Sequence, residues 1–370
     1  MSYNVLITGG SGYLGGTLLN RLQSAGLPAL KLYALVRKDS QAEAVKQYGA
    51  EPLTFDAYEE SAVREAVLKH EINVVFSLHD AFKADSAVAF IKALAELENN
   101  TGRNVHFLHT TGAKAFSSHM GAPIDKPFAD NDNLHGIHKA QHPPIPCLQP
   151  LLDTNITVTE LSESLGVQGY VFAPCIVYGK GEGFGNKISI QTVAVVDAAK
   201  AAKKVYRVDQ GRPTWPVCHI LDNTALYIQL LRNIVSGRQQ GYGKNGYYLA
   251  SPGSVAWEDI YSGIARAMYK QRAIHDDTVH QADGAALEEM AQGLGCDKAM
   301  VAFQLGGACL LTAKHGVEIG WKPEYGPEHI LSSLDEEVDL IFQHKSDWAF
   351  ACTMTGVFDP RPICFQYLCS

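Results

Sequence analysis

The sequence predicts an α/β fold in which helices cover both faces of a parallel sheet. Short apolar runs alternate with amphipathic stretches of helical period through the first half of the chain. A glycine-rich turn joins the first apolar run to the first amphipathic stretch. Hydrophobic residues make up 46% of the 370 residues, which is enough to bury a large core. Right-handed crossovers between the strands then give a doubly wound order.

The first half of the chain supplies the main strands and the helices that connect them. The predicted strands are residues 5–8, 31–37, 51–55, 73–78 and 104–110. The predicted helices are residues 15–25, 40–48, 59–69 and 87–97. Because each strand is followed by a helix of moderate length, these segments form βαβ units. Four prolines within residues 141–150 predict that no helix continues through that stretch.

The second half of the chain alternates less regularly. The predicted elements are a helix at 157–165, a strand at 169–177, a helix at 190–204, a strand at 215–220 and a helix at 224–236. From residue 253 to about residue 344 the pattern is mostly helical. We therefore expect a large domain, a small C-terminal substrate domain and a tail without an assigned role, at residues 1–250, 251–344 and 345–370. Pocket segments of the large domain are expected from about residue 180.

The charge balance argues against a nucleic-acid partner. The formal net charge is −8 and the sequence pI is about 5.9. Nucleic-acid binding needs a basic face, and the nearest approach to one is a lysine cluster at positions 200, 203 and 204. These lysines fit the solvated face of a helix. We expect a small-molecule substrate instead.

The cysteines and the apolar runs indicate the compartment. Eight cysteines are scattered without a CxxC pair, so no metal site is expected. The chain shows no apolar window of the roughly 18 residues that a membrane span needs. It begins directly with a strand-like run and has no basic leader pattern. We expect a cytoplasmic protein with free thiols and no membrane partner.

The glycine-rich turn TGGSGYLG is the most informative motif. Gly9 permits a sharp turn after the first strand, and Gly12 lets the backbone approach a pyrophosphate. Gly15 lets the first helix pack closely against the strand. The turn also contains Tyr13 and Leu14, which we place at the cofactor with the three glycines. This pattern predicts a Rossmann domain that binds a dinucleotide; the alternative is a glycine-rich turn without a ligand.

Two residues beyond the turn bear on the choice of cofactor. Arg37 ends the second strand, where an arginine can meet the 2′-phosphate of NADP and an acidic residue would favour NAD. We therefore expect NADP, with NAD as the alternative. Arg37 could instead stack over adenine or face solvent. Asp56 could contact the adenine, or it could cap the next helix because Glu59 follows three residues later.

With the turn in place, residues 3–340 resemble an atypical extended short-chain dehydrogenase/reductase of the NAD(P)-dependent epimerase/dehydratase type. The matching segments are LHTTG at 108–112, PCIVYG at 174–179 and VCHILD at 217–222. The run at 179–191 looks like that of fungal members, which often serve secondary metabolism. The resemblance implies an oxidoreductase or isomerase with a nicotinamide cofactor.

The family's catalytic set is altered in this chain. The family implies a Ser/Thr, followed by a Tyr and a Lys spaced four residues apart on one helix face. None of the sixteen tyrosines has lysine four residues later. Lys139 stands in the lysine position, so His135 occupies the tyrosine position. The Ser/Thr position falls at Thr111 or, with a one-residue shift of the alignment, at Gly112, and we choose Thr111. In the family's scheme the lysine also binds the cofactor, so Lys139 is a cofactor residue as well.

The role of His135 has several readings. A neutral imidazole is a competent acid or base, and the ammonium of Lys139 would lower the pKa of the imidazole. His135 could also be a surface histidine or a relic of lost catalysis. If the helix register differs, His138 could take the role.

The resemblance implies five further contacts. Leu78, His79 and Pro174 are expected at the cofactor, with His79 facing the cleft or only packing there. Tyr178 and Asn186 are expected at the substrate, although an aromatic residue in an apolar strand is more often core.

Three functions follow. The first is an NAD(P)-dependent oxidoreductase or cofactor-assisted epimerase that acts on a small, fairly apolar metabolite. The second is a non-redox isomerase, dehydratase or cyclase in which His135 moves a proton and the cofactor is a spectator. The third is a nucleotide-sensing protein without catalysis. Pairing as a homodimer through helices is a further expectation.

Overall fold

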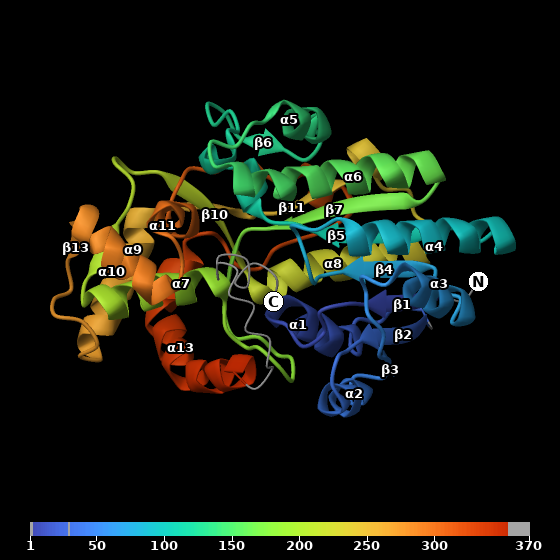
Figure 1. The fold of residues 1–370 in the computed structure, drawn as a ribbon, viewed down its shortest axis with the longest axis horizontal. Helices are drawn as coiled ribbons and strands as arrows, with labels where there is room; N and C mark the ends of the chain where they lie inside the picture. Colours follow the sequence, from blue (N-terminus) through green and yellow to red (C-terminus); the bar gives the residue numbers. More distant parts are fainter. Residues whose placement is uncertain (1–2, 29, 354–370) are drawn as a thin grey trace.

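A seven-stranded parallel sheet forms the centre of the computed structural model, which describes residues 3–28 and 30–353 (Figure 1). The strand order is β11-β7-β5-β4-β1-β2-β3, which reverses direction between β1 and β4. The predicted doubly wound order is therefore confirmed. The strands are β1 (Tyr3–Ile7), β2 (Leu30–Leu35), β3 (Ala50–Leu53), β4 (Val74–Ser77), β5 (His106–Thr110), β7 (Gln168–Pro174) and β11 (Tyr247–Ala250).

Helices cover both faces of this sheet because alternate side chains of each strand point to opposite sides. One apolar cluster joins the sheet to helices on the first face, and a second cluster does so on the other. The first face carries α1 (Tyr13–Leu22), α2 (Asp39–Lys46) and α8 (Ile220–Val235). The other face carries α3 (Glu60–Lys69), α4 (Asp85–Thr101) and α6 (Gln149–Leu165).

A short helix, α5 (Leu134–Ala140), packs against α6 at the outside of the sheet (Figure 1). It follows β6 (Phe128–Ala129), which pairs with β14 (Leu311–Thr312). This helix therefore covers part of the outer side of α6.

The expected pairing of the chain as a homodimer stays a prediction.

The predicted strand at 169–177 is wrong as a single element. The main-sheet strand β7 ends at Pro174, and β8 (Ile176–Tyr178) joins a separate sheet. That sheet has the order β12-β10-β8, with β10 at Thr214–His219 and β12 at Gly253–Ala256. Both halves of the run are buried, so its apolar pattern gave no sign of the break.

The predicted helix at 157–165 is too short, because α6 already begins at Gln149. Pro150 lies in its first turn, where a missing N–H costs no intrahelical bond. The prolines of residues 141–150 therefore end α5 and begin α6, and no helix runs through the whole stretch, as predicted.

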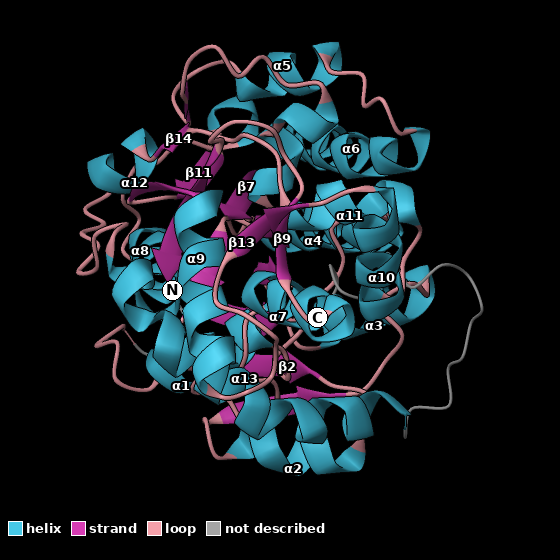
Figure 2. Cartoon of the chain, turned by 90° about the vertical axis from the view of Figure 1, so that its left-hand side faces the viewer, coloured by secondary structure: helices cyan, strands magenta, loops and turns pink. Residues whose placement is uncertain are grey.

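A second lobe, at the left of Figure 1, contains the three-stranded sheet and most of the C-terminal helices, several of which face the viewer in Figure 2. It takes α7 and β10 from before residue 250, so its packing is not confined to residues 251–344. The predicted domain boundaries stay predictions, and residues 354–370 of the predicted tail lie outside the described part. The remaining elements are α7 (Ile190–Ala202), β9 (Val205–Arg207), α9 (Trp257–Lys270), β13 (Val279–Gln281), α10 (Gly284–Leu294), α11 (Lys298–Leu305), α12 (Lys314–Glu318) and α13 (His329–Thr353).

The described residues contain no helix that is both long and apolar enough to cross a membrane. Within the same part of the chain, no group of three or more His, Cys, Asp or Glu side chains could hold a metal ion. The five cysteines whose side chains are described are free, as predicted. The cytoplasmic location stays a prediction.

Candidate nucleotide cofactor site

The glycine turn lies at the carboxyl end of β1, where the sheet order reverses. Gly9 has a φ of +69°, and a Cβ there would lie 2.7 Å from the carbonyl oxygen of Leu78. A Cβ on Gly15 would lie 2.3 Å from the carbonyl oxygen of Gly9. Neither position accepts a larger residue, so the turn and the close packing of α1 depend on glycine.

The start of α1 fits an anionic group. The N-cap is Gly12, whose extended backbone offers no side chain to cap the helix. The N–H of Gly12 is bound to the oxygen of Gly9, which fixes the turn with an N···O distance of 2.9 Å. The first N–H groups of α1 and the positive end of its dipole are thus presented without a side-chain cap. A pyrophosphate group fits this donor set.

Leu78 and His79 connect β4 to the turn. The N–H of Leu78 donates to the hydroxyl of Thr8 at 3.0 Å. His79 lies 2.7 Å from the same hydroxyl through Nδ1 and 3.0 Å from Ser86 Oγ through Nε2. Burial lowers the pKa of His79. Both ring nitrogens have protein partners, so the structure supports the packing reading of His79.

Pro174 lies at the carboxyl edge of the sheet, three strands from β1. It ends β7, is buried, and pairs in register with Ala250 of β11. The structure therefore places it at the carboxyl end of a strand, as the expected cofactor contact requires. The contact itself stays a prediction.

Arg37 and Asp56 follow the ends of β2 and β3. Arg37 is exposed, and its backbone N–H donates to Gln41 Oε1 at 3.0 Å. Asp56 accepts the N–H of Tyr58 at 2.9 Å. The cap of α3 is Glu59, whose carboxylate accepts two backbone N–H groups of the first turn. The alternative of Asp56 as the helix cap is therefore wrong.

The side chain of Tyr13 is buried and contacts the end of β8. Its hydroxyl donates to the carbonyl oxygen of Gly179 at 2.6 Å, and its side chain is 2% exposed. Burial raises the pKa of Tyr13 well above its ordinary value. Leu14 packs with Tyr13 in a small apolar cluster. The side chain of Tyr13 thus holds the chain at Gly179, and a cofactor contact would come from its backbone N–H.

The segment after Gly179 lies against the outside of α1 and reaches the turn itself (Figure 1). A Cβ on Gly183 would lie 2.5 Å from the Cα of Gly16, and one on Gly185 would lie 2.1 Å from the oxygen of Ser11. The N–H of Asn186 donates to that oxygen at 2.9 Å. Asn186, expected at the substrate, is thus placed at the glycine turn. Gly181, Gly183 and Gly185 each approach α1 or the turn so closely that a Cβ would collide there.

Tyr178 belongs to the core. It is 1% exposed, its hydroxyl lies 3.1 Å from His329 Nδ1, and burial raises its pKa. Its ring packs edge-on against His219 with centroids 5.2 Å apart. These contacts support the core reading over a substrate contact.

Thr111 lies at the carboxyl end of β5. Its N–H donates to the oxygen of Phe172 at 2.8 Å, which extends the sheet pairing by one residue. Its hydroxyl is buried and has no partner within the described part of the chain. A Cβ on the next residue, Gly112, would meet no atom within 4 Å. An unsatisfied hydroxyl beside open space is a candidate substrate contact.

His135 and Lys139 meet at a third residue. His135 Nε2 lies 3.2 Å from Glu160 Oε1, and Lys139 Nζ lies 2.8 Å from the same oxygen. The pKa of His135 is lowered, as expected, but burial is the main cause and Lys139 contributes less. The structure therefore brings the predicted pair together on Glu160.

The location of Glu160 sets this pair apart from the glycine turn. Helix α6 leads into the amino end of β7 and so runs antiparallel to the strand. Glu160 lies roughly 16 Å along the axis from the first residue of α6, at 1.5 Å per residue, and thus toward the amino edge of the sheet. The turn lies at the carboxyl edge and four strands from β11, on the side opposite α5 (Figure 1).

His138 does not offer an exposed replacement for His135. It is fully buried, with its ring 4.6 Å from that of Phe116 and its Nδ1 3.5 Å from the hydroxyl of Tyr247. Burial lowers the pKa of His138 to about 3. The imidazole is therefore a packed, neutral core group.

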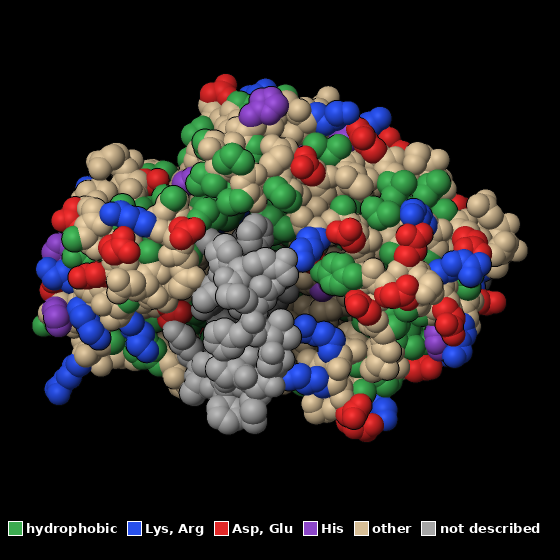
Figure 3. Space-filling view, viewed as in Figure 1, with side chains coloured by type: hydrophobic (Ala, Val, Ile, Leu, Met, Phe, Trp, Pro, Cys, Tyr) green, Lys and Arg blue, Asp and Glu red, His purple; other side chains and the backbone are tan. Residues whose placement is uncertain are grey.

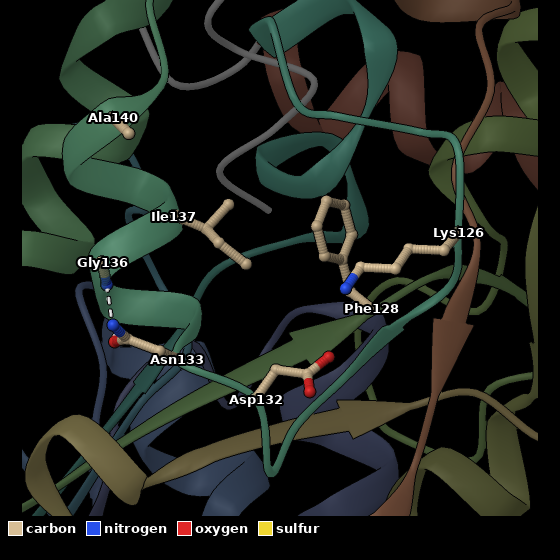
Figure 4. A pocket seen from close by; sticks show the side chains of 7 residues that line it. All are labelled: Lys126, Phe128, Asp132, Asn133, Gly136, Ile137 and Ala140. Atoms are coloured by element: carbon tan, nitrogen blue, oxygen red, sulfur yellow. Dashed lines mark hydrogen bonds between the residues drawn. The ribbon is translucent and has the colours of Figure 1, made fainter.

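A surface pocket beside α5 does not include the predicted pair. Asn133 caps α5 there by accepting the N–H of Gly136 at 3.0 Å (Figure 4). The pocket is lined by Lys126, Phe128, Asp132, Asn133, Gly136, Ile137 and Ala140. Neither His135 nor Lys139 lines it, so it provides no catalytic setting for them.

Sequence reasoning missed Lys114, three residues after Thr111. Its ammonium lies 4.4 Å from the ring centroid of Trp215 and donates to the carbonyl oxygens of Phe303 and Gln304 at the end of α11. Burial lowers its pKa to about 7. The carbonyl end of a helix favours a cation, so Lys114 ties the edge of β5 to the second lobe. A lysine four residues after the end of a buried strand was the available signal.

The doubly wound sheet and the glycine turn define a Rossmann-type protein whose turn fits a dinucleotide. The NAD dependent epimerase/dehydratase family matches residues 5–135, which contain the glycine turn and the strands β1 to β5. Among curated proteins, none matches the sequence.

Solved structures of three enzymes share the fold over nearly their whole length. UDP-glucose 4-epimerase from Thermotoga maritima has a TM-score of 0.60 and 13% identity, covering 92% of this chain and 99% of that one. dTDP-glucose 4,6-dehydratase from Bacillus anthracis, in complex with NAD, has a TM-score of 0.61 and 12% identity, covering 91% and 96%. Vestitone reductase from alfalfa has a TM-score of 0.59 and 17% identity, covering 91% and 98%. The fold is therefore confirmed, whereas the expected kinship with fungal secondary-metabolism members stays a prediction.

Proposed function

We propose that this protein is an NADP(H)-dependent oxidoreductase or cofactor-assisted epimerase that acts on a small, fairly apolar metabolite. The observation that carries the proposal is the uncapped start of α1 above a turn that tolerates no Cβ at Gly9 or Gly15. That geometry leaves backbone donors for a pyrophosphate. The exposed guanidinium of Arg37 at the end of β2 supports NADP over NAD.

The nicotinamide group would supply hydride transfer when bound. The residues of this chain would bind and orient the reactants. The buried hydroxyl of Thr111 lacks a partner in the described part of the chain and would hold a substrate oxygen by a hydrogen bond. The open space at Gly112 would admit the substrate beside it. His79 would keep the turns after β1 and β4 in place.

His135 and Lys139 have less support as the acid–base pair. A base must reach the proton that it moves, and His135 Nε2 already lies 3.2 Å from Glu160. Lys139 shares that carboxylate and its side chain is 54% exposed. The contact of His135 with Glu160 also weakens the hypothesis of a non-redox isomerase, dehydratase or cyclase, because that hypothesis needs His135 at the substrate.

A second candidate is a nucleotide-sensing protein without turnover. The observation in its favour is that His135 and Lys139, which stand at the family's catalytic positions, both contact Glu160. This candidate shares the cofactor site with the first and differs only in chemistry.

Fluorescence titration of the purified protein with NADPH and NADH tests the shared cofactor site. We expect saturable binding of both with NADPH preferred, because the turn serves either cofactor and Arg37 favours the extra phosphate. Absence of binding to either cofactor in a folded sample would contradict the proposal. Circular dichroism and a thermal melt would establish that the sample is folded.

Substrate screening by nicotinamide absorbance separates the enzyme from the sensor. A set of small apolar ketones and alcohols that changes the absorbance at 340 nm would favour the redox enzyme. Once a substrate is found, His135→Ala tests the acid–base assignment. Loss of activity with unchanged NADPH affinity would support a base, whereas full activity would exclude His135 from the chemistry.

A further inference from the structure

The turns that follow β3 and β4 are tied together at the carboxyl edge. The hydroxyl of Tyr58, in the turn after β3, donates to Asp80 Oδ2 at 2.6 Å. The other oxygen of Asp80, in the turn after β4, accepts the N–H groups of Phe82 and Lys83 at 2.9 and 3.2 Å. These bonds hold Tyr58 in a defined position although its side chain is 46% exposed.

Lys83 is fixed over that tyrosine. Its ammonium lies 5.9 Å from the centroid of the Tyr58 ring, within the range of a cation–π contact. Within the described part of the chain, Lys83 takes part in no salt bridge, whereas Lys92 on α4 is paired with Glu60 at 3.0 Å. Its positive charge is thus oriented by a ring and not neutralised by a carboxylate.

Arg37 lies at the same carboxyl edge of the main sheet, after β2. The ring of His79 lies 6.0 Å from that of Tyr58, and the charge of Arg37 acts on His79 to lower its pKa, after the larger effect of burial. Arg37 follows β2 and Tyr58 follows β3, the strand paired with β2, so Arg37 and the Lys83–Tyr58 contact lie at the carboxyl edge of neighbouring strands. Figure 3 shows Lys and Arg side chains on this face of the molecule beside the carboxyl edge of the main sheet.

Two acidic groups of these turns, Asp80 and Asp56, accept hydrogen bonds from their own or the neighbouring turn. Asp80 accepts three hydrogen bonds, and Asp56 accepts the N–H of Tyr58 at 2.9 Å. Asp39, in the first turn of α2, is favourably placed at the positive end of that helix. A dianionic ligand at this edge of the sheet would therefore meet Arg37 and Lys83, with the exposed Lys38 next to Arg37 in the chain.

We propose that Lys83 is a second cationic contact for the 2′-phosphate of NADP(H), acting together with Arg37. The inference rests on the proposed cofactor function and adds a specificity residue that the glycine motif and the end of β2 do not reveal. A terminal phosphate carries close to two charges near neutral pH, and a second cation strengthens its discrimination from a ribose hydroxyl.

Fluorescence titration of Lys83→Met with NADPH and NADH tests the inference, and Lys92→Met on α4 is the matched control. We expect Lys83→Met to weaken NADPH binding about 10-fold and to leave NADH binding within about twofold, because only NADPH carries the extra phosphate. Competition by adenosine 2′,5′-bisphosphate should weaken by the same factor, whereas competition by 5′-AMP should not change. The control should leave all four affinities unchanged.

The outcomes separate this inference from the proposed function. Equal weakening of NADPH and NADH would overturn it, because Lys83 would then act on the site as a whole. Unchanged affinities in Lys83→Met, with wild-type protein that still prefers NADPH, would also overturn it and leave the proposed function standing. Absence of NADPH and NADH binding in the folded wild type would overturn both.

Discussion

The glycine turn and the α5–α6 contact differ in what their polar groups meet. At the turn, α1 begins without a side-chain cap, and nearby the hydroxyl of Thr111 has no partner within the described part of the chain. At α5, His135 and Lys139 both reach the carboxylate of Glu160. His135 Nδ1 is also buried without a partner in the described part of the chain, so the uncapped helix start, and not an unpartnered atom by itself, distinguishes the glycine turn.

This comparison shows why spacing was a better guide at one region than at the other. The glycines act within a few residues of each other: Gly15 closely approaches Gly9 in the same turn, and Gly9 approaches Leu78 after the neighbouring strand β4. The four-residue spacing of His135 and Lys139 does place both on one helix face, as expected. What that face meets is decided by Glu160, which no local pattern identifies.

The largest expected effect is at the glycine turn. Gly15→Val should weaken NADPH binding more than about 300-fold, because a side chain there collides with the turn that faces the pyrophosphate. Fluorescence titration measures the change. Gly26→Asn is the control, since a Cβ on Gly26 meets no atom within 4 Å and asparagine tolerates the positive φ of that position. Near-normal binding by a folded Gly15→Val variant would show that the turn does not hold the cofactor.

Buried histidines near both regions should make the protein sensitive to acid. Burial lowers the pKa of His109 to about 4 and that of His138 to about 3. Between those values and the ordinary pKa near 6.5, the unfolded chain binds more protons than the folded one. Stability should therefore fall as the pH drops from about 6.5 toward 4, by roughly 3 kcal/mol for His109 alone.

His109→Leu sharpens this prediction. Both ring nitrogens of His109 lack partners in the described part of the chain, so an apolar side chain removes an unsatisfied group. Urea unfolding at pH 7.5 and pH 5 should show a smaller loss of stability for the variant than for the wild type. His280→Leu is the control, because His280 is half-buried and bound to Asp276. Equal losses in wild type and His109→Leu would exclude His109 as a source of the acid sensitivity.

The smallest expected effect is at Lys139. Lys139→Met should leave NADPH affinity unchanged and alter the free energy of unfolding by only ~0.5 kcal/mol, because its pairing with Glu160 is solvent-exposed. Glu160→Gln should behave in the same way. A 10-fold loss of NADPH affinity in Lys139→Met alone would break the comparison and return Lys139 to the cofactor site.

The sequence by itself determined the alternation of strands and helices, the doubly wound order and the turn between β1 and α1. These features depend on hydrophobic periodicity and on backbone conformations that glycine and proline impose over a few residues. The sequence did not predict that one apolar run divides into β7 and β8, because burial in either sheet requires the same residue types.

Only the tertiary structure decided which polar side chains meet. It placed Glu160 beside His135, Lys114 at the carbonyl end of α11, and Lys83 over Tyr58. The partners in these contacts are separated by 21 or more residues and come together through the crossing of distant elements. A sequence pattern extends over a few turns or one strand, so it cannot specify the burial, the charge and the hydrogen-bond partners that such contacts create.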